Sequence, residues 1–169
     1  EMFGDFLVGP AFPDSVEHFC FSLGQPDVMT ELIVTLHGRT DLPTAIRAMA
    51  AVSHECLSTG FSTWCQDTCA WYLQIGNRPA RDIWLERLAS AQVLGGTGMS
   101  NTMKAFAGIE DLRLSGERVD GGYIVNGSLP WVSNLGDDHV FGTLFTLSGD
   151  TSRTIMALVD CSAPGFSLR

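Results

Sequence analysis

The apolar residues of this sequence follow one spacing in the first half of the chain and another in the second half. Up to about residue 91 they recur every three or four positions, as on one face of an α-helix. From about residue 93 they form short runs separated by turn residues, as in successive β-strands. Helices followed by strands, without regular alternation, are typical of α+β proteins. We therefore expect an α+β fold, with a helical domain over residues 1–94 and a β-domain over residues 95–169.

Helix boundaries in the first half follow from turn and breaker residues. Asp41-Leu42-Pro43 places proline where a first helical turn tolerates it, and Gly76-Asn77 is a stop signal. Gly24-Gln25-Pro26 separates two weaker helix candidates. The expected helices are residues 41–56, 64–75 and 79–91, with 16–23 and 28–37 as the weaker candidates.

The second half predicts an antiparallel sheet or barrel. Asp120-Gly121-Gly122 and Asn126-Gly127 supply the positive φ that tight hairpin turns need. The run Gly95-Gly96-Thr97-Gly98 lacks the strand–loop–helix context of a phosphate-binding loop, so we interpret it as the hinge between the two parts. The strand candidates are residues 112–114, 123–125, 140–147 and 154–159.

The strand expected after Asn126-Gly127 carries Trp131 and Ser133 two positions apart. Side chains alternate across a strand, so both would lie on one face, roughly 7 Å apart. A flat indole beside a hydroxyl could hold an aromatic heterocycle and hydrogen-bond its edge. The same spacing also fits a core tryptophan beside a surface serine, and on spacing alone that second interpretation is favoured.

Composition and charge exclude several classes of protein. The chain is 45% hydrophobic and 17% charged, as in an ordinary globular protein. Its net charge is −9 and it has no basic stripe, so we expect no nucleic-acid partner. No apolar run approaches the roughly 20 residues that span a bilayer, so we expect no membrane association.

The cysteine count is odd and no secretory signal precedes the cysteines, which indicates free thiols in a reducing compartment. We therefore expect a cytoplasmic location, or the mitochondrial matrix in a eukaryote. Cys65 and Cys69 stand four apart on one side of an expected helix and are interpreted as buried structural thiols. No matching Cys/His pair completes a zinc site, and no metal is expected. The cysteines are Cys20, Cys56, Cys65, Cys69 and Cys161.

Three stretches carry a resemblance to a known family. They are residues 84–90 (WLERLAS), 120–134 (DGGYIVNGSLPWVSN) and 157–166 (ALVDCSAPGF). In order and spacing they resemble the acyl-CoA dehydrogenase superfamily of flavoproteins: the helix before its flavin strand, its "GDGYVLNGxKxWITN" segment and its later "fLVd…PGv" strand and turn. The resemblance implies an N-terminal helical domain and part of a middle antiparallel β-barrel-like domain. The family's C-terminal helical domain is then expected to lie outside this chain.

The resemblance also implies FAD as cofactor and a reaction. In the family, a carboxylate removes the α-proton of an acyl thioester and a hydride passes to flavin N5. The partners implied are acyl-CoA or a related substrate and an electron-transfer flavoprotein. A homo-oligomer, or association with the remaining C-terminal half, is also implied. The implied flavin contacts are Met99, Ser100, Asn101, Trp131, Val132 and Ser133, and the implied substrate contacts are Ala107 and Gly108. With the resemblance added to the spacing, flavin contact at Trp131 and Ser133 becomes the preferred interpretation.

The chain departs from the family in one important segment. The family's "TEPxAGSD" strand falls on residues 101–108, where Asn101 replaces Thr and Ala107-Gly108 replace the Ser-Asp of the acyl-thioester channel. Ordinary fatty acyl-CoA specificity is therefore not expected to carry over. The family's glutamate base comes from its C-terminal domain, and no catalytic residue is assigned here. The local carboxylates are interpreted as turn or strand-surface residues: Glu110, Asp111, Glu117 and Asp120.

Two alternatives remain open at the level of sequence. One is a flavin-dependent monooxygenase or N-hydroxylase of the same superfamily, to which the altered 101–108 segment gives weight. The other is a non-catalytic subunit without flavin. The unfinished end of the expected sheet and the Ala107-Gly108 departure favour that second alternative.

Overall fold

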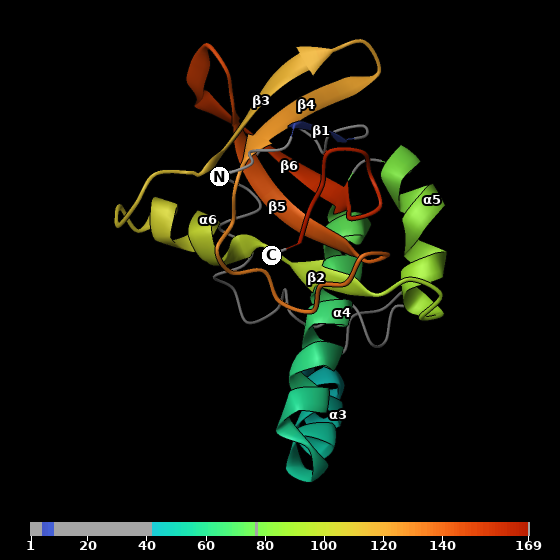
Figure 1. The fold of residues 1–169 in the computed structure, drawn as a ribbon. Coiled ribbons are helices and arrows are strands. Elements are labelled where there is room, and N and C mark those ends of the chain that lie inside the picture. The colour runs from blue at the N-terminus through green and yellow to red at the C-terminus, as the bar shows by residue number, and fades with distance from the viewer. Residues whose placement is uncertain (1–4, 9–41, 77, 169) are drawn as a thin grey trace.

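We describe residues 5–8, 42–76 and 78–168 of the computed structural model (Figure 1). These residues form an α+β fold, as the change of periodicity predicts. The helices are α3 (Leu42–Glu55), α4 (Leu57–Ile75), α5 (Arg78–Ala89) and α6 (Met99–Phe106). The strands are β1 (Asp5–Val8), β2 (Gly95–Thr97), β3 (Leu114–Val119), β4 (Gly122–Gly127), β5 (Val140–Leu147) and β6 (Asp150–Asp160). The two weaker helix candidates, 16–23 and 28–37, lie outside the described residues.

The three helices expected from periodicity are confirmed. Gly76 ends α4, where its N–H donates to the carbonyl of Leu73 at 3.2 Å. Helices α3 and α4 lie side by side; α3 lies away from the sheet, whereas α4 continues to β2 and β5 (Figure 1). Their close approach depends on Gly60, since a Cβ there would lie 1.9 Å from the Ser53 hydroxyl oxygen.

The segment after α5 differs from the expectation. The interpretation of residues 95–98 as a hinge is wrong, because Gly95–Thr97 forms strand β2 in the sheet. The missing side chains let neighbouring groups approach closely: a Cβ on Gly95 would lie 2.6 Å from Cys69 Cβ, and one on Gly96 2.4 Å from the Ser133 carbonyl oxygen. Residues 99–106, where the resemblance implies a strand, form helix α6, whose buried Met99 and Thr102 recur at helical spacing.

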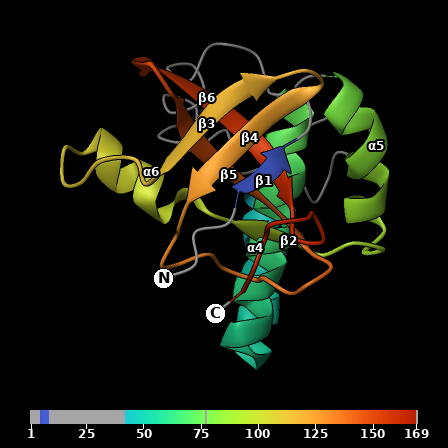
Figure 2. The ribbon, with the colours of Figure 1, turned by 45° about the horizontal axis from the view of Figure 1, so that its top comes forward.

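The sheet is mixed and open, which corrects the expectation of an antiparallel barrel. Strand β4 pairs antiparallel with β1 and β3, and β5 pairs antiparallel with β6. Strands β2 and β3 instead pair parallel with β5. Figure 2 shows β1 beside β4 at one side of the sheet. Strand β1 contacts β6, but no ladder between them closes the sheet in the described ranges.

The connection after β4 explains this topology. The predicted turn between β3 and β4 is confirmed: Val119 pairs with Gly122, and Gly121 has φ +83°. The second predicted turn, Asn126-Gly127, is wrong, because both residues belong to β4 and Gly127 pairs with Leu114. The chain then crosses β3 through residues 128–139 before β5 begins, and this crossing makes β5 parallel to β3.

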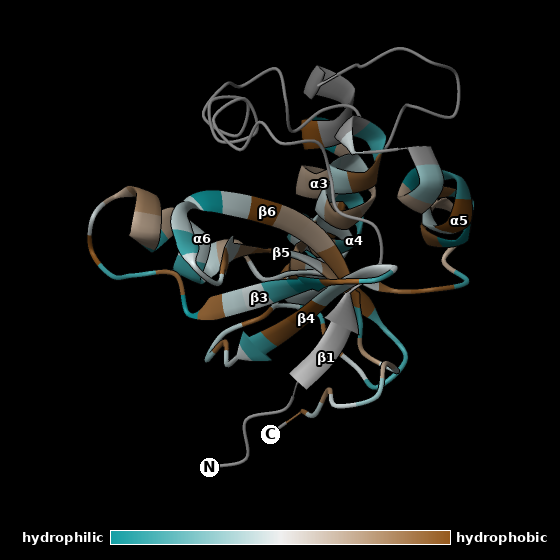
Figure 3. Ribbon diagram, turned by 90° about the horizontal axis from the view of Figure 1, so that it is seen from above, coloured by the Kyte–Doolittle hydropathy of each residue, from teal (hydrophilic) through white to brown (hydrophobic). Residues whose placement is uncertain are grey.

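Strand β5 forms the centre of the fold because it is buried on both faces. Its Val140 and Leu144 join an apolar cluster with α4 and α5, whereas Phe141 and Phe145 join a second cluster with β3, β4 and β6. Figure 3 shows the apolar stretches of β5 and β6 between the helices and the β3–β4 pair. Gly142 faces the first cluster, where a Cβ would lie 2.2 Å from the ring of Tyr72 in α4.

We expect Gly142→Ala to lower the free energy of unfolding by about 2–3 kcal/mol, because the added methyl group displaces the Tyr72 ring from a packed core. Urea unfolding followed by circular dichroism measures this change. The control is Gly149→Asn: Gly149 has φ +85° and open space around it, a conformation that asparagine tolerates. Equal losses in the two variants would contradict the packing argument.

Candidate functional site

Of the residues expected to contact a flavin, Trp131, Val132 and Ser133 lie on a loop and not on a strand. The other three, Met99, Ser100 and Asn101, form the first turn of α6. Within residues 128–139, here called the Trp131 loop, only Ser133 pairs with the sheet, through a bridge to Thr97. The Thr97 N–H donates to the Ser133 carbonyl at 3.3 Å, and the Ser133 N–H donates to the Thr97 carbonyl at 3.2 Å. Pro130 has no N–H to donate, so a longer ladder would lose a hydrogen bond here. The expectation of a strand through Trp131 is therefore wrong.

Trp131 and Ser133 have different surroundings. The Trp131 side chain is 72% exposed, so the core-tryptophan interpretation is wrong. Ser133 is half-buried, and its hydroxyl interacts with the thiol of Cys65 on α4. Burial raises the pKa of Cys65 to about 11, and the hydrogen bond with Ser133 opposes that increase. Strand alternation therefore does not place these two side chains on a common face.

Anchors on both sides of Trp131 hold the loop against the sheet. Leu129 and Val132 are partly buried and pack against the cluster that contains Phe141 and Phe145. The Leu129 side chain also approaches Gly98, where a Cβ would lie 3.2 Å from it. The loop therefore passes over β2 and the start of α6. Trp131 is exposed there, between the partly buried Leu129 and Val132.

Helix α6 begins at this crossing. Gly98 precedes the helix, and no side chain caps its first turn. The N–H groups of a first turn lack partners within the helix and favour acceptor or anionic groups. Met99 is buried and Ser100 is exposed. The exposed Trp131 indole and the uncapped N–H groups at the start of α6 both lie where the Trp131 loop passes α6. Together they suit a flat ring whose edge carries hydrogen-bond acceptors.

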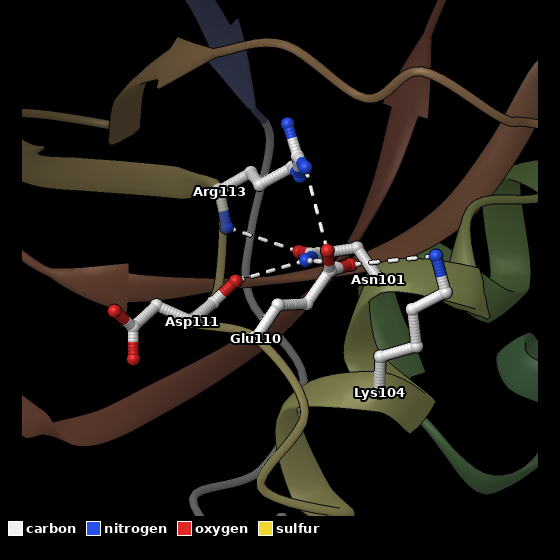
Figure 4. A network of polar contacts seen from close by, with 5 residues as sticks. All are labelled: Asn101, Lys104, Glu110, Asp111 and Arg113. Atoms are coloured by element: carbon white, nitrogen blue, oxygen red, sulfur yellow. Dashed lines mark hydrogen bonds and ion pairs between the residues drawn. The ribbon is translucent and has the colours of Figure 1, made fainter.

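Asn101 is buried and its amide is used within the protein (Figure 4). Its Nδ2 donates to Glu110 Oε1 at 3.0 Å and to the Asp111 carbonyl at 2.9 Å, and its Oδ1 accepts from the Arg113 N–H at 3.0 Å. The side chain thus fastens α6 to the loop that follows it. A flavin contact at Asn101 would have to use its backbone N–H group.

Glu110 sits at the centre of this network. Arg113 Nη2 approaches its Oε2 at 3.3 Å and Lys104 Nζ its Oε1 at 3.8 Å. The hydrogen bond from Asn101, aided by Arg113 and Lys104, lowers the pKa of the Glu110 carboxyl below its ordinary value. Glu110 is therefore a structural carboxylate bound to two cations and not a free base.

The implied substrate residues lie at the other end of α6. Ala107 follows the helix, and its N–H donates to the Met103 carbonyl at 3.1 Å. Gly108 has φ +68° and both residues are exposed. Ala107 stands seven positions after Ser100, a distance of about 10 Å along the helix axis. The structure therefore does not bring the implied substrate residues into contact with the Ser100 end.

Asp67 is a candidate functional residue that the sequence reasoning missed. It is 8% exposed, and its Oδ2 has no hydrogen-bond partner among the described residues. Burial raises the pKa of its carboxyl to about 7. The available signal was that Asp67 is the single charged residue of α4, whose nineteen residues are otherwise uncharged. No hydrogen bond or ion pair joins it to the Trp131 loop in the described part of the chain.

The cysteines are free thiols within the described residues. Three are buried, namely Cys65, Cys69 and Cys161, and Cys56 is exposed. Cys20 lies outside the described ranges. Asp111, Glu117 and Asp120 are exposed, as expected of surface carboxylates. Among the residues described, no three His, Cys, Asp or Glu side chains form a group that could hold a metal ion. No described helix has the length and apolar character needed to cross a membrane.

Comparison with known proteins adds no family assignment. No protein-family model matches the sequence, and no curated protein matches it. The function is therefore argued from the residues and their geometry.

We expect Asn101→Ala to lower the free energy of unfolding by about 2–3 kcal/mol, because it leaves the Arg113 N–H and the Asp111 carbonyl without their partner. The control is Lys104→Ala, which removes only a half-exposed ion pair and should cost less than about 0.5 kcal/mol. Urea unfolding measures both. A cost for Asn101→Ala as small as the control would show that the network does not fasten the loop.

A second prediction concerns pH. The pKa of Asp67 is about 7 when folded against an ordinary value of 3.8, so the folded chain binds this proton more tightly. Its contribution to the free energy of unfolding therefore falls as pH rises from about 4 to about 7, by at most about 1.4 kcal/mol per pH unit. Asp67→Asn cannot ionise, so its gain in melting temperature should be larger at about pH 8 than at about pH 5.

The control for this experiment is Asp120→Asn, which changes an exposed carboxylate in a turn. Its effect should be the same at both pH values. A gain for Asp67→Asn that does not depend on pH would contradict a raised pKa at this position.

Proposed function

We propose that this chain is the flavin-binding part of an FAD-dependent oxidoreductase of acyl-CoA dehydrogenase type. In this proposal helices α3, α4 and α5 belong to the N-terminal helical domain, and the open sheet, which includes β1, belongs to the middle β-domain. The observation that carries the proposal is the exposed Trp131. Its side chain is 72% exposed although the nearby Leu129 and Val132 are partly buried against the sheet.

A large apolar side chain held outward in this way is suited to bind a ligand. Exposing an indole to water forgoes the stabilisation that its burial would give. Aromatic rings pack favourably in offset or edge-to-face geometry, and the isoalloxazine of FAD is a flat ring system of suitable chemistry. The partly buried Leu129 and Val132 limit how far the loop can move, so Trp131 offers the ring a fixed contact.

The polar contacts in the proposal come from the start of α6. The N–H groups of Ser100 and Asn101 belong to a first turn that no side chain caps, and they suit the carbonyl oxygens and ring nitrogen of the flavin's pyrimidine edge. Ser133, whose hydroxyl interacts with Cys65, would supply the contact near flavin N5. Met99 and Val132, both packed in the sheet region, would support the two ligand-facing segments.

The bound flavin would accept a hydride from the substrate. The residues of this chain would orient the ring through Trp131 and exclude water from its inner face. None of the local carboxylates is placed as a base: Glu110 is bound to two cations, and no hydrogen bond joins Asp67 Oδ2 to any described residue. The proton-abstracting carboxylate therefore stays unassigned.

A non-catalytic subunit without flavin is the second candidate. The observation in its favour is Asn101, whose side-chain amide makes three hydrogen bonds within the protein. Only backbone groups then remain at that position to recognise a ligand. A flavin monooxygenase shares the flavin contacts and differs in its reaction with oxygen.

Titration of the full chain with FAD tests the proposal. We expect saturable quenching of flavin fluorescence and a shifted visible absorbance band. Trp131→Ala should weaken FAD binding about tenfold, since loss of an aromatic stack and of the area it buries costs roughly 1.4 kcal/mol. The control is Ile109→Ala, which removes another strongly exposed apolar side chain, 71% exposed, from the loop after α6.

Three results would decide between the candidates. FAD binding that depends on Trp131 and not on Ile109 supports the flavoprotein proposal. No binding at all, in a chain that melts cooperatively, would favour the non-catalytic candidate. A peroxyflavin seen when the reduced, loaded chain meets air would identify a monooxygenase and exclude the dehydrogenase.

A further inference from the structure

The segment just after Trp131 is held by two hydrogen bonds that involve Asn134. The side-chain Nδ2 of Asn134 donates to the Gly95 carbonyl of β2 at 2.8 Å. The Asn134 carbonyl accepts from the imidazole Nδ1 of His139, also at 2.8 Å. Asn134 is therefore bonded on one side to the sheet and on the other to the end of its own loop.

The backbone at Asn134 requires a residue of this kind. Its φ is +59°, in the left-handed region that few residues other than glycine, asparagine and aspartate adopt readily. Asparagine combines this tolerance with a side-chain donor. Glycine would keep the conformation without the donor, and aspartate would present an acceptor to the Gly95 carbonyl.

The close packing beneath the loop strengthens this attachment. A Cβ on Gly96 would lie 2.4 Å from the Ser133 carbonyl oxygen and 3.2 Å from that of Asn134, so only glycine lets the loop approach β2 this closely. His139 occupies a similar position against Gly136, where a Cβ would lie 2.8 Å from its Nε2. The imidazole therefore fills the inside of the turn.

We propose that Asn134 and His139 are positioning residues that fix the Trp131 loop on β2 and so set the place of the Trp131 indole. They touch no ligand themselves. Asn134 holds Ser133 beside Thr97, and His139 holds Asn134. Trp131 is two residues from Ser133, so its position depends on both. The inference rests on the proposed function only for its effect on FAD, because the fixing of the loop is a property of the chain alone.

The test uses the full chain labelled with fluorotryptophan. The chain has four tryptophans, and Trp131→Phe assigns the fluorine resonance of Trp131. Asn134→Asp and Asn134→Gly should both shift that resonance and accelerate amide hydrogen exchange at Thr97 and Ser133. The control is Ser128→Ala, an exposed change in the same loop that should leave both measurements unchanged.

His139 allows a rescue experiment that a general loss of stability would not mimic. His139→Ala removes the donor to the Asn134 carbonyl and should shift the Trp131 resonance. His139→Asn places an amide nitrogen close to the position of Nδ1 and should restore it. A variant whose amides exchange faster across the whole sheet is unfolding globally. In that case the comparison of His139→Ala with His139→Asn decides whether the two residues position the loop.

Affinity for FAD completes the experiment. We expect Asn134→Asp to weaken FAD binding about tenfold, because the Trp131 indole would still be present but displaced from its place against the ring. An unchanged Trp131 resonance and unchanged Thr97 and Ser133 exchange in both Asn134 variants would overturn the positioning role. If the unmodified chain binds no FAD, the proposed function fails, while the resonance and exchange measurements still judge the positioning role.

Discussion

The contact between Tyr72 and Gly142 joins the helical and sheet parts of this protein, and the candidate site depends on it. The Tyr72 ring lies against β5 where Gly142 has no side chain, and its hydroxyl bonds the Thr97 hydroxyl at 2.8 Å. That bond fixes β2 between α4 and the Trp131 loop. Thr97 in turn holds Ser133 through two backbone hydrogen bonds. A chain of contacts therefore connects the helix to the loop, and Trp131 owes its place to side chains far from it in the sequence.

Local spacing predicted the elements whose formation is local. Helices α3, α4 and α5 follow the recurrence of apolar residues, and strands β4, β5 and β6 follow short apolar runs. Strand β3 (Leu114–Val119) shares only Leu114 with the run expected at residues 112–114. The path between strands was not predictable in this way. Asn126-Gly127 has the composition of a turn, but the pairing of Gly127 with Leu114 keeps it in β4. The parallel pairing of β3 with β5 follows from that extension, because the chain must then cross β3 to reach its next partner.

The geometry around the candidate site residues was not predictable from the sequence. The sequence singled out Trp131 and Ser133, and strand alternation placed them on one face. The bridge at Ser133 is a single pair, so Trp131 is free to point outward while Ser133 interacts with Cys65. Asp67 could have been found, because one charge in an uncharged helix is unusual for a solvated face. Its burial depends on how α4 packs, and spacing alone does not contain that information.

Side chain and backbone of α6 have different roles at Asn101. Asn101 stands where the acyl-CoA dehydrogenase segment that the sequence resembles has threonine, and its side chain fastens the loop that contains Glu110 and Arg113. The N–H groups of the first turn belong to the backbone, so their availability does not depend on which side chain stands at residue 101. A ligand that bonds those N–H groups would tolerate this substitution, whereas one that needs a side-chain hydroxyl would not. The identity of residue 101 is therefore weak grounds against flavin binding, and the decisive quantity is the position of the Trp131 indole relative to the start of α6.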